Sequence, residues 1–131
     1  MQSITNYDAK DCTVLVDNVY ITGLGEDMVT GEKDEESVST SVGAQGDVVV
    51  NKVNNTLGTI TLTVQATSPQ RKHLDTLANT QKIFPIWVAN KALDEMMGGT
   101  KAMMKKPASR EYSAELADRE YEIQVFDFTV K

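Results

Sequence analysis

The sequence predicts a mainly β fold, an antiparallel β-sandwich or barrel-like domain with one α-helix packed on it. Apolar and polar residues alternate with a period of two over residues 37–42 and 59–66, as in strands with two unlike faces. Helical periodicity is clear only over residues 68–80, between two β-rich halves. A length of 131 residues is typical of one domain, so residues 1–131 are expected to form a single unit.

The first part of the chain predicts two short strands followed by a loop. Residues 12–16 and 19–22 are rich in β-branched residues and flank a tight turn at Asp17-Asn18. Residues 23–36, "GLGEDMVTGEKDEE", are polar, acidic and interrupted by glycine, with only a weak β signal around Met28. We therefore expect residues 23–36 to form mainly an exposed acidic loop.

Residues 37–66 predict a three-stranded meander. In "SVSTSVG", Val38, Thr40 and Val42 point to one side and the serines to the other. "VVVNKV" is the returning strand, and "GTITLTVQAT" is the clearest strand of the chain. Its residues Ile60 and Leu62 lie on an apolar face, opposite a face of threonines. The meander is thus expected to have one apolar face and one small, polar face.

The segment "SPQRKHLDTLANT", residues 68–80, predicts the helix. Ser68 is a favourable N-cap, and Pro69 suits the first helical position because its missing N–H has no partner there. Leu74, Leu77 and Ala78 form a narrow apolar stripe. His73 lies beside the stripe and is interpreted as a surface or half-buried helix histidine.

Residues 82–131 predict a second β-rich half. "KIFPIWVAN" is a strand in which Pro85 indicates an edge position or a bulge, and Trp87 is expected in the core. "KALDEMMGG" is expected to be a short helical or loop excursion, followed by a strand or loop. In "YEIQVFDFTV" the alternation slips near Val125 and Phe126, which a bulge or a change of burial would explain.

Composition and charge exclude several classes of protein. The net charge of −6 and pI near 4.7 argue against a protein that grips nucleic acid through its phosphates. Cys12 is the only cysteine and His73 the only histidine, so neither an internal disulfide nor a zinc site is expected. The sequence has no signal-peptide pattern and no apolar stretch of membrane-spanning length, so we expect synthesis in a cytoplasm and no membrane anchoring.

No residue pattern predicts catalysis. The acidic cluster Glu32, Asp34, Glu35 and Glu36 lacks the ligand spacing and central glycine of an EF-hand loop, so it is expected to be a solvated charged loop or at most an adventitious calcium site. The chain has no GxSxG elbow, P-loop or Rossmann pattern. We expect no catalytic residue, no metal site and no cofactor, and hence no enzyme.

The polar strand faces suggest an assembly. A lone domain usually covers exposed strands with Lys, Glu and Arg, whereas residues 37–42 and 59–65 present serine and threonine. Such short, uncharged side chains suit a surface packed against copies of the same chain, or a smooth wall facing water. The alternative is an ordinary solvent-exposed face of an antiparallel sheet.

Several ordered motifs resemble the tail tube proteins of long-tailed bacteriophages and of phage-tail-like bacteriocins. They are "DMVTGEKDEE", the turn "VGAQGDV", the strand "NNTLGTITLTVQATSP", and the helix ending "LDTLAN". "FPIWV" and "KKPASREYSAELADREYEIQV" resemble the C-terminal half of the family, with Tyr121 where tryptophan is common. The resemblance covers about residues 8–130.

The resemblance implies a β-sandwich or barrel-like tube fold, six copies of which form a ring. Stacked rings form a hollow tube in the virion tail, which conducts genome DNA during ejection. Implied partners are other copies of the chain, a sheath protein if the tail contracts, baseplate and tail terminator proteins, and, in the lumen without specific binding, the tape-measure protein and DNA.

The resemblance also assigns expected roles to residues. Residues 37–52 and 57–66 would form the hairpin that lines the lumen, with its polar residues facing inward: Ser37, Ser39, Ser41, Asp47, Thr59, Thr61, Thr63 and Gln65. The acidic loop would contact the neighbouring ring or subunit through Glu26, Asp27, Glu32, Asp34, Glu35 and Glu36. A basic cluster would contact the sheath or a neighbouring copy, unless it is only a solvated patch: Lys101, Lys105, Lys106 and Arg110.

Two alternatives remain at the level of sequence. The chain could form the tube of a DNA-free, phage-tail-like bacteriocin. A monomeric β-sandwich binding module is the alternative from another class, but such a module normally exposes aromatic residues, and Trp87 is the only tryptophan.

Overall fold

The computed structural model describes residues 6–131, and it confirms a mainly β, antiparallel fold with one α-helix in that range. Residues 1–5, part of the expected 1–131 unit, lie outside the described residues. The helix α1 spans Arg71–Thr80, and a 3-10 turn, η1, spans Ala9–Asp11. The strands are β1 (Cys12–Val16), β2 (Val19–Tyr20), β3 (Leu24–Lys33), β4 (Val38–Val42), β5 (Val48–Lys52), β6 (Gly58–Val64), β7 (Phe84–Asn90), β8 (Glu95–Met104), β9 (Arg119–Val125) and β10 (Thr129–Val130).

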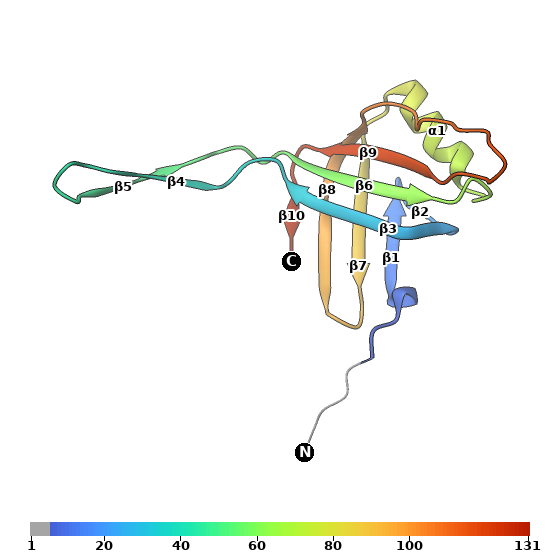
Figure 1. Cartoon of the computed structure of the whole chain (residues 1–131), viewed down its shortest axis with the longest axis horizontal. Coiled ribbons are helices and arrows are strands. Elements are labelled where there is room, and N and C mark those ends of the chain that lie inside the picture. Colours follow the sequence, from blue (N-terminus) through green and yellow to red (C-terminus); the bar gives the residue numbers. More distant parts are fainter. Residues whose placement is uncertain (1–5) are drawn as a thin grey trace, which may run out of the picture.

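One continuous sheet forms the body, in the order β2-β1-β7-β8-β9-β6-β3, with β10 paired to β8. β8 joins two halves of this sheet, since it pairs with β7 over most of its length and with β9 near its C-terminal end. Figure 1 shows β1, β7 and β8 running across the direction of β3, β6 and β9. The sheet therefore folds over on itself in the manner of an orthogonal sandwich or open barrel.

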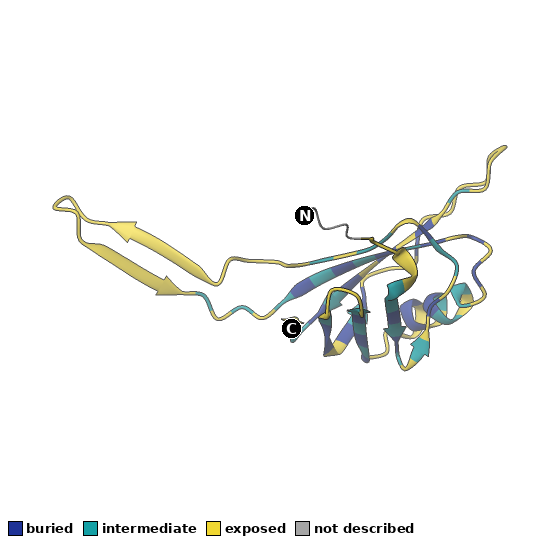
Figure 2. Ribbon diagram, turned by 90° about the horizontal axis from the view of Figure 1, so that it is seen from below, coloured by how far each residue is buried: buried dark blue, intermediate teal, exposed yellow. Residues whose placement is uncertain are grey.

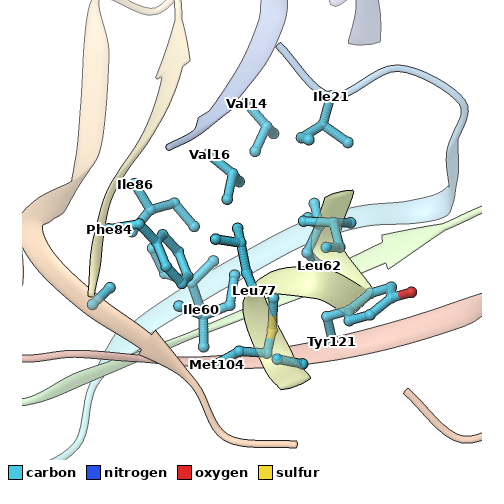
Figure 3. Close-up of a cluster of buried hydrophobic side chains, with 14 of the residues drawn as sticks. Val14, Val16, Ile21, Ile60, Leu62, Leu77, Phe84, Ile86, Met104 and Tyr121 are labelled. Carbon is cyan, nitrogen blue, oxygen red and sulfur yellow. The ribbon is translucent and has the colours of Figure 1, made fainter. Parts of the chain in front are cut away.

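The core lies between the two halves of the sheet. Figure 3 shows Val14 and Val16 of β1, Ile86 of β7, and Ile60 and Leu62 of β6 pointing toward one another, and all five are at most 5% exposed. The helix adds its apolar stripe, which is buried as predicted: Leu74, Leu77 and Ala78. Burial of this apolar surface is the main stabilising contribution to the fold.

Strands β4 and β5 form a separate two-stranded sheet that projects from the body (Figure 1). We call residues 38–52 the arm. Every residue of the arm is exposed, and Figure 2 shows it as a continuous exposed ribbon next to the buried interior of the body. A two-stranded hairpin without packing partners is marginally stable at best in water.

The prediction of an exposed loop over residues 23–36 was wrong. Residues 24–33 form β3, an edge strand paired with β6 from Val29 to Lys33 and again at Leu24. A bulge separates these two parts, and Met28 has a positive φ of 40° there. The bulge and the glycines interrupt the alternation of apolar and polar residues in the sequence of β3. Hydrogen bonding to β6 nevertheless keeps this segment extended.

The predicted three-stranded meander over residues 37–66 was also wrong. β4 and β5 pair with each other, but β6 pairs with β3 and β9 instead of β5. Two stretches of extended chain at residues 34–37 and 53–57 separate the arm from the body. The two faces predicted for β6 were correct, because Ile60, Leu62 and Val64 are fully buried whereas the threonines between them are not.

The helix begins later than predicted. Its N-cap is Gln70 rather than Ser68, and its side chain makes no capping hydrogen bond. Ser68 is buried, and its hydroxyl donates a hydrogen bond to the carbonyl oxygen of Thr22 at 2.6 Å. The side chain therefore stabilises the segment before β3 and does not cap α1. The predicted end at Thr80 was correct, and Gln81 follows in the left-handed conformation.

The structure decides four expectations for the second half. Pro85 lies in an interior strand, and its position coincides with a register shift between β7 and β8, so the bulge alternative is correct. Trp87 is half-buried on the face away from the core, with Lys131 Nζ 5.3 Å from its ring centre. Residues 95–99, expected in a helical or loop excursion, belong to β8. The change in alternation after Val125 marks the end of β9 and a turn into β10.

Candidate functional site

A polar face covers three adjacent strands of the body, on the side opposite the core. Cross-strand pairs place Thr59 between Glu32 of β3 and Gln124 of β9. Thr61 likewise lies between Thr30 and Glu122. Because directly paired residues share a face of an antiparallel sheet, these side chains form two polar rows across β3, β6 and β9.

The structure therefore brings together one part of the predicted lumen-facing set. Thr59, Thr61 and Thr63 lie on the polar face and are half-buried, and Gln65 follows β6 and is exposed. The other part lies elsewhere, on the arm and at its root and tip: Ser37, Ser39, Ser41 and Asp47. The predicted set thus divides between two separate sheets.

Sequence reasoning missed the carboxylates on the polar face. Glu120 and Glu122 pair with Thr63 and Thr61, so both lie beside the threonine row. The sequence pattern that could have located these glutamates is the alternation of polar and apolar residues in "REYEIQV". In the structure Tyr121 and Ile123 are buried and the glutamates are exposed. That alternation showed a strand, but only the pairing of β9 with β6 shows which face the glutamates share.

Asp34 fixes the root of the arm to the polar face. Thr59 Oγ1 and Gln124 Nε2 donate hydrogen bonds to its two carboxylate oxygens at 2.7 and 3.0 Å. The backbone N–H of Asp34 also donates to the carbonyl of Leu57, at 3.0 Å. The hydrogen bonds from Thr59 and then Gln124 lower the pKa of this carboxyl, because they favour its charged form.

The arm itself has two unlike faces. Its register pairs Val38 with Lys52, Thr40 with Val50 and Val42 with Val48, which places four valines on one face. Ser39 pairs with Asn51 and Ser41 with Val49 on the other face. The four valines are 48–68% exposed. The apolar face of the arm, defined by Val38, Val42, Val48 and Val50, is therefore not covered by any other part of residues 6–131.

The acidic residues of the predicted loop occupy three places. Glu26 and Asp27 lie in the bulge of β3, and Glu32 lies on the polar face. Asp34 is engaged at the root of the arm, and Glu35 and Glu36 are exposed in the extended segment that follows. No group of three or more potential ligands (His, Cys, Asp or Glu) within residues 6–131 is placed to hold a metal ion.

Three of the four basic residues lie around Glu122, and Lys101 lies within β8. Lys101 and Lys105 lie at the C-terminal end of β8, where Lys105 Nζ is 3.9 Å from Glu122 on the polar face. Arg110 is beside the helix and donates to Asp75 at 3.0 Å. Lys106 and Arg110 border a surface hollow of about 380 Å³ together with Glu120 and Glu122.

The fold, its polar face and its uncovered arm all suit a subunit of an assembly, and a family comparison identifies which kind. The sequence matches the model of the bacteriophage PhiTE tail tube protein family over residues 13–124. The chain belongs to this family of phage tail tube proteins. A search of curated proteins gave no match to the sequence.

Solved structures of contractile injection systems share the fold of this tail tube family member. The sheath/tube terminator of the extracellular contractile injection system PVC, in its extended state, has a TM-score of 0.75 at 12% identity, covering 99% of each chain. The tube-terminating cap of the anti-feeding prophage has a TM-score of 0.69 at 12% identity, covering 100% of this chain and 94% of that one. The PVC sheath-tube complex gives a TM-score of 0.71 at 13% identity, covering 96% of this chain and 91% of the other.

Membership of the tail tube family makes this chain a structural component of a tail and not an enzyme. The likeness to the injection-system proteins confirms the tube fold. Among the described residues, no helix is long and apolar enough to cross a membrane.

Proposed function

We propose that six copies of this tail tube protein form a ring, and that the rings stack into a hollow tube through which genome DNA passes during ejection. The observation that carries this proposal is the arm, whose apolar face is left exposed by the described residues. Exposed apolar patches of this kind mark contact surfaces. Full burial of each valine against a neighbouring copy would contribute about 1.5–3 kcal/mol.

The free edge of β3 supports the same proposal. Within residues 6–131, β3 is the last strand of the sheet and pairs with β6 alone. Exposed sheet edges invite pairing with another chain, and closing a ring of subunits removes them. The family's tube and the free edge together favour a contact in which each copy extends the sheet of the next.

The polar face suits the wall of the channel. Its threonines are short and uncharged, and the nearby Glu32, Glu120 and Glu122 carry negative charge. DNA phosphates would be repelled by such a wall and would slide past it rather than bind. In this arrangement Thr59, Thr61 and Thr63 face the lumen, and the arm, with Ser39 and Ser41 on its second face, reaches toward a neighbouring copy or ring.

Electron microscopy of the concentrated protein, with its mass measured in solution, tests the proposal. We expect six-fold rings or hollow tubes, formed spontaneously or after addition of tail baseplates that nucleate them. A protein that stays monomeric at every concentration and also fails to polymerise on baseplates would contradict the tube and favour a monomeric binding module.

Two matched variants test the role of the arm. V48K/V50K places two charges on the apolar face, and S39K/S41K places the same two charges on the opposite face. Both variants should fold, because every residue of the arm is exposed. We expect V48K/V50K to abolish tubes and S39K/S41K to retain them, whereas equal loss in both would contradict a special role of the valines.

A second candidate is the tube of a DNA-free contractile particle. The likeness to the PVC and anti-feeding prophage components supports it, since those proteins belong to injection systems. The same likeness suggests a sheath and a terminator as partners of this chain. Sequencing nucleic acid recovered from purified, nuclease-treated particles would separate the two candidates, because phage particles would retain a genome.

A further inference from the structure

We propose that adjacent copies within the ring meet through opposite charges carried on the two edges of the sheet behind the polar face. This inference rests on the proposed ring. The acidic β3 edge of one copy would lie against the basic end of β8 of the next copy. The partner of the basic residues would then be a second copy of this chain rather than a sheath.

The sheet behind the polar face has two open edges. On one side, β3 pairs with β6 and has no strand beyond it in the described residues. On the other side, the pairing of β7 with β8 reaches no further than Ala102, while β9 continues to pair with Met103 and Met104. Past Ala102, β9 is therefore the one strand that the described part of the chain pairs with β8.

The two edges carry opposite charge. Residues 26–36 contain six acids and one base, Lys33, so their formal charge is 1 − 6 = −5. Residues 101–106 contain three lysines and no acid, so their formal charge is +3. We call these the acidic edge and the basic edge.

The charges of the two edges are largely uncompensated within one copy. Ion pairs within residues 6–131 join Lys82 to Asp17, Lys105 to Glu122, and Arg110 to Asp75. Only Lys105 belongs to either edge, and its 3.9 Å contact joins two side chains that are 40% and 47% exposed. An exposed pair of this kind contributes little, so Lys105 remains available to a neighbour.

Most of the acidic edge is too far from the basic edge to be neutralised within one copy, because the two are separated by three strand spacings, or about 14 Å, which exceeds the Debye length of about 8 Å at physiological ionic strength. Asp34 is the exception, because its pKa is lowered by the hydrogen bonds from Thr59 and Gln124 and also by the charge of Lys105. A head-to-tail contact between copies brings the two edges together. Such a contact joins two different surfaces of the same chain and generates a closed ring when the rotation between copies is appropriate.

Segregated charge also distinguishes this arrangement from an ordinary solvated surface. Lone domains usually intersperse both signs of charge on their surface. Here six acids gather at one edge and three lysines at the other, and the threonines of β6 lie between them together with Glu120 and Glu122 of β9. Opposite charges at an interface steer association and fix which surfaces meet.

Charge-swap variants test the proposal. E26K/D27K/E32K changes the formal charge of the acidic edge from −5 to −5 + 6 = +1, and K101E/K105E changes that of the basic edge from +3 to 3 − 4 = −1. K72E/K91E is the matched control, since both lysines are exposed and lie away from either edge, on α1 and in the turn after β7. Thermal unfolding of each monomer checks folding, and electron microscopy with light scattering follows assembly on baseplates at low and high salt.

We expect each edge variant alone to lose tube formation by tenfold or more, and the control to assemble like the wild type. An equimolar mixture of E26K/D27K/E32K and K101E/K105E should recover assembly, because edges of +1 and −1 then meet at one contact and edges of −5 and +3 meet at the next. Assembly of the wild type should weaken as salt rises.

Three results would overturn the proposal, and a fourth would reject the proposed function. Normal tubes from both edge variants would show that the edges do not meet, and the tube itself would stand. Loss in each variant without recovery in the mixture would show that the edges act in separate contacts. Normal tubes from K101E/K105E that no longer bind sheath would assign the basic edge to the sheath. Failure of the wild type to assemble on baseplates would instead reject the proposed function.

Discussion

The hydroxyl of Thr59 donates a hydrogen bond to the carboxylate of Asp34 at 2.7 Å and so joins β6 to the root of the arm. Gln124 donates to the other carboxylate oxygen at 3.0 Å, and its Nε2 also donates to the carbonyl of Gly58 at 2.9 Å. Three separate segments thus meet at one exposed carboxylate. This junction sets the direction in which the arm leaves the body.

Replacing Asp34 with alanine should loosen the arm without unfolding the body. Asp34 is exposed, so the change in the free energy of unfolding should stay within about 0.5 kcal/mol. NMR order parameters of residues 38–52 should fall, because the arm loses two side-chain hydrogen bonds at its root. The control is D47A at the tip of the arm, which removes a carboxylate without affecting the root; equal loss of order in both variants would contradict this role.

The two faces of β6 should respond differently to truncation. Leu62 is fully buried, so Leu62→Ala should lower the free energy of unfolding by about 2–5 kcal/mol. Thr61→Ala, one residue away on the polar face, should change it by about 0.5 kcal/mol or less. Urea unfolding of the monomer measures both, and similar costs would contradict the assignment of faces.

Gly58 allows the Phe128 ring to pack directly on the start of β6. A Cβ at this position would overlap the ring, so Gly58→Ala should cost about 1–3 kcal/mol. Gly43→Ala in the arm is the matched control, because its Cβ would meet only the Asp47 carbonyl oxygen, 3.7 Å away. Thermal unfolding compares the two variants, and F128A should partly rescue G58A if the ring is the cause.

Tyr121 should make stability fall in alkaline solution. Burial, followed by the 2.8 Å hydrogen bond that its hydroxyl donates to Asp75, raises the pKa of this phenol in the folded state. A raised pKa means that the folded protein holds the proton more tightly than the unfolded chain does. The stabilisation is therefore complete below the unfolded pKa of about 10 and is lost as pH rises above it.

The comparison of wild type with Y121F isolates this effect. At neutral pH the variant should be less stable by about 1 kcal/mol, the usual net contribution of one hydrogen bond. The difference between the two proteins should shrink as pH rises above about 10, because only the wild type carries the titrating phenol. A difference that stays constant from pH 8 to 11 in urea unfolding would rule out this role for Tyr121.

Local patterns in the sequence predicted the elements whose side chains alternate cleanly. Cys12–Val16 and its turn at Asp17-Asn18, the two faces of β6, and the apolar stripe of the helix were all correct. In each case burial on one side imposes a periodic pattern that can be read from neighbouring residues. The mainly β fold class and the family followed from the same segments.

Elements that depend on distant partners were missed or misplaced. β3 has a bulge, glycines and one free edge, so its sequence reads as a loop, and its pairing with β6 makes it a strand. Ser68 is a good cap by residue type, but its hydroxyl bonds to Thr22, 46 positions away in the chain.

The sequence by itself determined which residues are buried on one side of a strand or helix, because that information is local and periodic. Only the tertiary structure decided which strands lie side by side. Pairing of β6 with β3 and β9 places Glu32, Glu120 and Glu122 beside the threonines, and it leaves β4 and β5 to form an arm with an uncovered valine face. Strand pairing depends on backbone hydrogen bonds and packing between distant segments, which a period of two does not specify.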